Sequence, residues 1–171
     1  MKSFSIIVPV YNEPQLIIEC LKNLDNLNYK KYEVIIVNDA STDETQKNIK
    51  NFIKNKKKFR LINNKKNEGR AKTRLAGAKN AEFHGLVFVD ARVTLSFNVL
   101  KHLNSKKEAV IIPGDVIQEG NIYGEILQNL KIRFVYRTFT AKITKNNFDH
   151  APKGLSACYF KKSLFLKSAK N

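Results

Sequence analysis

Short apolar runs alternate with amphipathic stretches along the first hundred residues of the chain. Apolar runs predict strands at Phe4–Val10 and at residues 34–37, 59–62 and 86–89. The spacing of the apolar residues between these runs predicts helices over residues 14–27, after Ser41, and over about 70–82. Because the strands are apolar on both faces, we expect a mainly parallel sheet that is covered by helices on both sides.

The rest of the chain continues the pattern less regularly. We expect a short helix near 96–104, a strand at 109–112, a helix within 121–145, a strand at 154–160 and a helix-like end at 163–171. Ser41 with Glu44 three residues later predicts a capping box for the second helix, which would bury Ile49, Phe52 and Ile53. Neither a linker nor an internal repeat is visible, so the sequence predicts one α/β domain over 1–171.

Composition agrees with a globular domain and narrows its class. The chain has 171 residues, of which 43% are hydrophobic and 27% charged. Cys20 and Cys158 fit neither a disulfide framework nor a zinc pattern, which favours a reducing compartment and buried cysteines. The first residues run straight into an apolar strand, so we expect no signal peptide, and no apolar stretch reaches the length of a membrane span.

The chain is strongly basic. Lys and Arg number 31 and Asp and Glu 15, a formal net charge of +16. Two interpretations stay open: a general Lys and Asn bias, or a basic face for nucleic acid, an anionic membrane or phosphorylated substrates. No aromatic-interleaved basic strand or reading helix is visible, which argues against nucleic acid.

Polar residues gather where the predicted strands end. Residues 11–13 follow the first strand, 38–41 the second and 90–92 the fourth, and Gly69 with Arg70 opens a helix. Ligands bind beyond the carboxyl ends of strands in open α/β sheets, so an aromatic ring, carboxylates and cations at this edge predict a nucleotide site. The G-x-G-x-x-G, P-loop and G-x-S-x-G patterns are absent, and the three histidines match no ligand spacing.

Three ordered motifs resemble the nucleotide-binding half of the family 2 glycosyltransferases. They are SIIVPVYNE at residues 5–13, VIIVNDASTD at 34–43, and Asn67-Glu68-Gly69 followed by Arg74. The resemblance implies a GT-A-like (Rossmann-like) α/β fold, with 3–92 as the nucleotide-binding half and 93–171 as a partial, apparently truncated acceptor half. It also implies inverting transfer from a UDP-linked sugar to an acceptor hydroxyl of a glycan, a lipid-linked molecule or a protein. The expected setting is cell envelope glycan synthesis in the cytoplasm or at the cytoplasmic face of the membrane.

The resemblance assigns the base pocket residue by residue. Pro9 and Tyr11 would line it, with Tyr11 against the ring, and Glu13 would lie near the ribose or base. Asp39 would accept the imide N–H of a uracil-type base. The alternatives are a half-buried ring for Tyr11 and an interaction with a helix N-terminus for Asp39.

The phosphate side departs from the family pattern. Gly69 would allow close approach, and Arg74 would reach the base or diphosphate unless it is a solvated helical charge. The family's Asp-x-Asp holds a divalent cation, Mn²⁺ or Mg²⁺, but here it reads Asp90-Ala91-Arg92. Either the metal is lost or Asp90 binds it weakly. Arg92 either neutralises the diphosphate directly or forms an ion pair with Asp90.

The family's catalytic base has no counterpart in a recognisable context. Residues 154–162 resemble the strand before the usual Gly-Phe-Asp turn, but neither that turn nor a Glu-Asp pair follows. Asp115 and Asp149 are the remaining aspartates of this half, and the catalytic residue stays unknown. The alternative function is an inactive module that binds a nucleotide, a nucleotide sugar or a protein partner.

Overall fold

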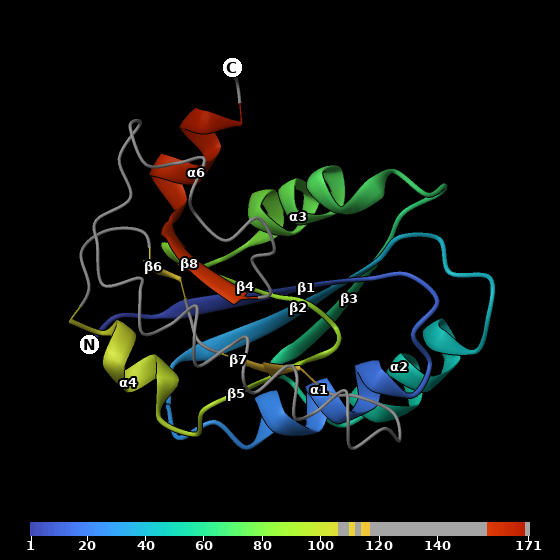
Figure 1. The fold of residues 1–171 in the computed structure, drawn as a ribbon, viewed down its shortest axis with the longest axis horizontal. Helices are drawn as coiled ribbons and strands as arrows, with labels where there is room; N and C mark the ends of the chain where they lie inside the picture. The colour runs from blue at the N-terminus through green and yellow to red at the C-terminus, as the bar shows by residue number, and fades with distance from the viewer. Residues whose placement is uncertain (106–109, 112–113, 117–156, 170–171) are drawn as a thin grey trace. The chain divides into compact units, whose positions relative to one another are not determined.

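A six-stranded sheet forms the centre of the fold (Figure 1). The computed structural model describes residues 1–105, 110–111, 114–116 and 157–169, all within one compact unit of Met1–Ile117 and Ser156–Asn171. The strands lie in the order β3-β2-β1-β4-β8-β6. Their bounds are β1 Phe4–Val10, β2 Tyr32–Asn38, β3 Phe59–Asn63, β4 Gly85–Val89, β6 Val110–Ile111 and β8 Ala157–Lys161.

The sheet is mainly parallel, as the sequence predicts. β3, β2, β1 and β4 pair in parallel, with Ile6 opposite both Val34 and Val87. β8 runs antiparallel to β4, and β6 runs antiparallel to β8. The parallel strands therefore end at one edge, where the polar residues after β1, β2 and β4 meet.

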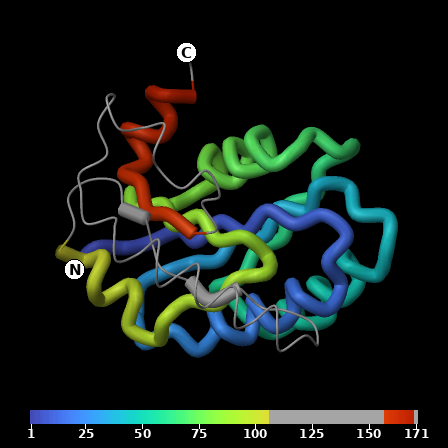
Figure 2. The backbone as a smooth tube through the Cα atoms, in the orientation of Figure 1, coloured from blue at the N-terminus to red at the C-terminus, as the bar shows by residue number. Residues whose placement is uncertain are grey.

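Helices cover both faces of the sheet (Figures 1 and 2). On one face lie α1 (Leu16–Asp25), α2 (Thr45–Ile53) and α4 (Val99–Leu103), and on the other lie α3 (Gly69–Asn80) and α6 (Lys162–Ser168). Alternate strand residues supply the two core clusters. Ile6 and Val8 pack with the first set of helices, while Ile7 packs with the second.

Gly77 lets α3 approach the sheet closely. A Cβ at this position would overlap with Ile7 Cγ2 and lie 3.2 Å from Val37 Cγ2. Glycine is a poor residue for a helix interior, so its use here reflects packing rather than helix propensity. The close approach sets the depth at which α3 presents its side chains beside the carboxyl edge.

The sequence analysis does not predict two short strands. β5 (Val93–Leu95) and β7 (Gly114–Val116) form a separate antiparallel pair, with Thr94 opposite Asp115. Each has three residues, too few for an alternating pattern to stand out. The pairing places the backbone of Asp115 beside the segment that follows β4.

The predicted capping box at Ser41 is wrong. α2 begins at Thr45, and Asp43 Oδ1 accepts the Thr45 N–H at 2.9 Å. The Ser41 hydroxyl instead accepts the Asn12 N–H at 3.0 Å, so the residue serves the neighbouring loop rather than the helix. Ile49 is buried, while Phe52 and Ile53 are partly buried against the same core.

Some predictions lie outside the described residues. These are the helix within 121–145, residues 154–156 of the last predicted strand, and Asp149. Within the described part of the chain, no helix is long and apolar enough to span a membrane.

Candidate functional site

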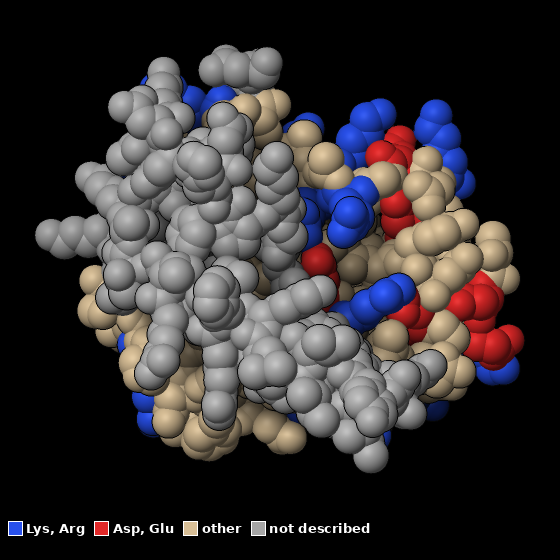
Figure 3. All heavy atoms as spheres, viewed as in Figure 1, with Lys and Arg blue, Asp and Glu red and all other residues tan. Residues whose placement is uncertain are grey.

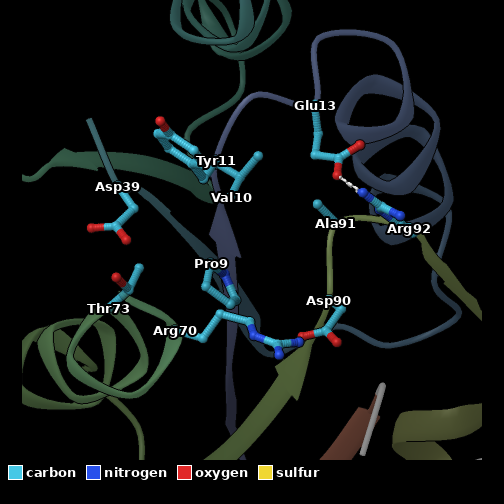
Figure 4. A pocket seen from close by; sticks show the side chains of 10 residues that line it. All are labelled: Pro9, Val10, Tyr11, Glu13, Asp39, Arg70, Thr73, Asp90, Ala91 and Arg92. Carbon is cyan, nitrogen blue, oxygen red and sulfur yellow. Dashed lines mark hydrogen bonds and ion pairs between the residues drawn. The ribbon is translucent and has the colours of Figure 1, made fainter. Parts of the chain in front are cut away.

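A pocket of about 410 Å³ opens at the carboxyl edge of the sheet, between the ends of β1, β2 and β4 and the start of α3. Its volume is within the range of small-molecule sites. Figure 4 shows the side chains that line it: Pro9, Val10, Tyr11, Glu13, Asp39, Arg70, Thr73, Asp90, Ala91 and Arg92. Six of the eight predicted site residues are among them. The other two, Gly69 and Arg74, hydrogen-bond to the lining carboxylates of Asp39 and Asp90.

The loops after β1 and β2 are hydrogen-bonded to each other. The Asn12 N–H donates to Ser41 Oγ at 3.0 Å, and Asn12 Oδ1 accepts the Thr42 N–H at 2.9 Å. The Glu13 N–H donates to Thr45 Oγ1 at 2.9 Å. These bonds fix the backbone that carries Tyr11 and Glu13, so this side of the pocket is organised before any ligand binds.

Three residues at this edge of the sheet have positive φ angles, the left-handed backbone conformation. Asn12 has φ 51°, Ala40 has φ 60° and Gly69 has φ 80°. Non-glycine residues seldom adopt this conformation, and such positions cluster at functional sites. A Cβ at Gly69 would meet no protein atom within 4 Å, so it is the positive φ that requires glycine there, and not protein packing.

Asp39 joins the end of β2 to the start of α3. Its Oδ1 accepts from Asn64 Nδ2 at 2.7 Å and from the Glu68 N–H at 2.9 Å, and its Oδ2 accepts the Gly69 N–H at 2.9 Å. Burial raises the pKa of Asp39, but these hydrogen bonds outweigh burial and hold its pKa below the ordinary value. The Thr73 hydroxyl adds to this lowering of the pKa of Asp39. The predicted interaction with a helix N-terminus is therefore present.

Asp90 is paired with a predicted site residue from α3. Arg74 Nη2 lies 2.5 Å from Asp90 Oδ1, and both side chains are about one quarter exposed. Arg74 is thus not a solvated helical charge. Its Nε is buried and has no hydrogen-bond partner among the described residues. A buried donor of this kind is suited to a phosphate oxygen or a water.

Arg92 is paired with Glu13, and the predicted alternative of an Arg92–Asp90 ion pair is wrong. Arg92 Nε donates to Glu13 Oε1 at 2.8 Å, and its Nη2 contacts the same oxygen (Figure 4). β4 ends at Val89, and the Val93 N–H bonds back to the Asp90 carbonyl in a turn. The alternation of a strand stops there, and although Asp90 and Arg92 both line the pocket, each pairs with a different partner.

The aromatic wall is partly open. Tyr11 is 45% exposed and Pro9 is buried at the end of β1. An exposed ring above a buried proline presents a face on which a base could stack. The structure therefore supports the predicted half-buried ring and leaves its face accessible.

Sequence reasoning placed Arg70 at this edge without assigning it to the site, and it missed Thr73, the other lining residue on α3. Arg70 extends toward Asp90 in Figure 4, and the fully buried Thr73 donates its hydroxyl to the Gly69 carbonyl at 2.8 Å. Their spacing carried the signal, because residues 70, 73 and 74 lie on one face of a helix.

The two cysteines are buried, as predicted. Burial raises the pKa of Cys20 to about 12 and that of Cys158 to about 11, despite the nearby Arg74 guanidinium in the second case. Neither thiol is a nucleophile at neutral pH.

The described residues do not fit a divalent cation. No group of three metal-ligating side chains occurs among them. The carboxylates of Asp90 and Glu13 already hold the guanidinium groups of Arg74 and Arg92. Mn²⁺ or Mg²⁺ would need several oxygen ligands and would lie against these positive groups.

Comparison with known proteins identifies the same family that the sequence motifs resemble. Residues 5–168 match the model of the family described as Glycosyl transferase family 2. Poly(ribitol-phosphate) beta-N-acetylglucosaminyltransferase TarS of Staphylococcus aureus strain Mu50 is 34% identical over 104 residues, which are 59% of this chain and 18% of TarS.

Solved structures agree with the fold. S. aureus TarS 1-349 in complex with UDP-GlcNAc aligns with a TM-score of 0.56 and 31% identity, over 60% of this chain and 30% of that chain. The mannosyltransferase PcManGT of Pyrobaculum calidifontis aligns with a TM-score of 0.67 and 21% identity, over 97% of this chain and 46% of that one. The GT-A-like α/β fold class is confirmed. The chain spans 12–42% of the length of the first curated relatives that it matches.

Proposed function

The chain belongs to glycosyl transferase family 2, and from this we propose that its pocket binds a UDP-linked sugar for inverting transfer to an acceptor hydroxyl. One observation carries the proposal. The three motifs lie far apart in the sequence, yet Tyr11, Asp39 and Arg70, which come from or next to them, line a single pocket. Residues 3–92 would form the nucleotide-binding half and 93–171 part of the acceptor half.

The base would bind between β1 and β2. Tyr11 offers a half-exposed ring for stacking, and the carboxylate of Asp39 lines the pocket as an acceptor for an imide N–H. Uracil carries such an imide and cytosine does not, so this pair favours a uridine nucleotide. TarS, which shares this part of the chain, has been solved with UDP-GlcNAc, and this supports the assignment.

The diphosphate would lie toward α3 and β4. Arg70 and Arg92 line the pocket there, and Arg74 forms an ion pair with Asp90. Guanidinium groups pair well with phosphate oxygens and keep their charge at any physiological pH. The positive end of the α3 dipole adds to this field.

Transfer would be a single displacement in which a base removes the proton of the acceptor hydroxyl. Asp115 and Asp149 are the aspartates of the acceptor half that could serve as this base. The second candidate function is a module that binds the nucleotide sugar without transferring it.

Partners and location follow from the same proposal. The acceptor would be a glycan, a lipid-linked molecule or a protein, handled in the cytoplasm or at the cytoplasmic membrane surface. On the face shown in Figure 3, Lys and Arg lie intermingled with Asp and Glu around the visible hollow. Such a mixed surface favours a small anionic ligand over a long nucleic acid.

Calorimetric titration with UDP, UDP-GlcNAc and GDP tests the proposal. We expect UDP to bind, GDP to bind more weakly, and Tyr11→Ala to weaken UDP binding by about tenfold, the loss of one stacked base. Phe97→Ala is the matched control, because Phe97 is an aromatic residue that is 59% exposed and does not line the pocket. Equal affinities in the wild type and in both variants would remove Tyr11 from the site.

A further inference from the structure

We infer that Arg92, held in place by Glu13, performs the charge balance that a divalent cation would otherwise provide, so that nucleotide binding needs no metal. The inference rests on the proposed function, since it concerns the diphosphate of the same donor. It differs from the metal-dependent arrangement that the family resemblance implies.

The position of Arg92 suits this role. Its side chain is 60% exposed at the pocket wall, whereas that of Glu13 is only 17% exposed. Two guanidinium nitrogens contact one oxygen of Glu13, so the group is anchored on one side and open on the other. A guanidinium has five N–H donors, and those not used by Glu13 remain for phosphate oxygens.

The charge change matches that of the missing ion. A carboxylate at position 92 would carry minus one, and the guanidinium of Arg92 carries plus one. This exchange adds two positive charges at one place, as much as Mn²⁺ or Mg²⁺ would bring. Adding a divalent cation to the present site would overshoot that balance and place like charges side by side.

The carboxylates at this edge already have partners, which agrees with a site where Arg92 takes the place of a metal ion. Asp90 holds Arg74 at 2.5 Å, and Asp39 accepts hydrogen bonds from Asn64 and from two backbone N–H groups at the start of α3. To ligate a metal, Asp90 would have to release Arg74, leaving a largely buried guanidinium without its partner. The buried Arg74 Nε still lacks an acceptor among the described residues, which again favours an anion over a cation at this place.

The test is UDP titration of the full chain in EDTA and in Mn²⁺, combined with electron paramagnetic resonance of Mn²⁺ without nucleotide. The variants are Arg92→Asp and Arg92→Gln. Lys30→Asp is the control, because it reverses an exposed charge in the loop before β2, at the opposite edge of the sheet. Circular dichroism confirms that each variant is folded, and Arg92→Gln serves if Arg92→Asp is not.

We expect wild-type affinity in EDTA and in Mn²⁺ to differ by less than about threefold, with no Mn²⁺ bound in the absence of UDP. Arg92→Asp should lose about tenfold or more in EDTA and recover in Mn²⁺, and Arg92→Gln should lose affinity in both. Lys30→Asp should behave as the wild type. Wild-type binding that requires Mn²⁺ would overturn the inference and leave the proposed function standing. Absence of UDP binding in both conditions would overturn the proposed function itself.

Discussion

The Gly69 N–H donates to Asp39 Oδ2 at 2.9 Å, so the residue that directly follows β2 also caps the helix that lines the phosphate side of the pocket. The Glu68 N–H joins the same carboxylate through Oδ1. A carboxylate at a helix N-terminus satisfies donors that the helix itself leaves unpaired. Asp39 is therefore a structural residue as well as a proposed ligand, and its two roles can be separated by experiment.

Asp39→Ala should lower the free energy of unfolding by about 1–3 kcal/mol, because two backbone N–H groups and Asn64 lose their acceptor. Chemical denaturation measures this. Asp43→Ala is the control, since Asp43 accepts one N–H at the start of α2. It should cost about 1 kcal/mol. In variants that remain folded, Asp39→Ala should also weaken UDP binding, while Asp43→Ala should not. Equal losses in Asp39→Ala and Asp43→Ala would show that the three hydrogen bonds to Asp39 stabilise the fold no more than the single bond to Asp43.

Acid should destabilise the protein through Asp39. Its pKa is lowered in the folded state, so its contribution is fully present above the unfolded value of about 3.9 and is lost as pH falls through the folded value. Asp39→Asn should therefore flatten the decline in unfolding free energy below about pH 5. Part of the decline should persist, because hydrogen bonds from Lys56 and Lys58 also hold the pKa of Asp25 low, against the effect of burial. An unchanged pH profile in Asp39→Asn would contradict the assigned cause.

The elements that the sequence predicts well are those with a clear physical period. β1, β2 and β4 are apolar on both faces, and the meeting of their carboxyl ends follows from parallel pairing. β5 and β7 are too short for a pattern. The start of α2 was misplaced because Ser41 and Asp43 both precede it, and only the three-dimensional structure shows which side chain faces the helix.

The site too has features that the sequence pattern predicts and others that depend on three-dimensional contacts. The ends of the predicted strands indicate which residues reach the pocket, and six of the eight predicted site residues line it. The sequence does not predict which of these charged side chains form ion pairs. The pairing depends on the turn at Asp90, which directs Arg92 away from the Asp90 carboxylate. Arg92 then meets Glu13, a residue 79 positions away in the sequence. Long-range ion pairs of this kind have no periodicity that a sequence could display.

Gly77→Ala should destabilise the protein, against the usual trend. In an exposed helix interior, alanine is about 1 kcal/mol better than glycine. Here the new Cβ would overlap with Ile7 Cγ2 and lie 3.2 Å from Val37 Cγ2, so overpacking should cost about 1–3 kcal/mol. Thermal and chemical denaturation measure the change. Ala71→Gly, at an exposed position of the same helix, gives the propensity difference alone. If Gly77→Ala raises stability, α3 has room to move away from the sheet.

The 171-residue chain should bind a UDP-sugar but transfer it slowly. A positioned general base contributes about 10²–10⁴-fold to such a reaction, and the pocket described above assigns that role to no residue. Release of UDP in the presence of acceptor hydroxyls, measured beside binding affinity, tests this directly. Asp115→Asn and Asp149→Asn are the informative variants, because these are the remaining aspartates of the acceptor half. Rapid transfer that one of them abolishes, with UDP affinity unchanged, would identify that aspartate as the base and reject the inactive-module alternative. Slow transfer unaffected by either would leave sugar binding as what this chain contributes, with the proton acceptor to be supplied from elsewhere.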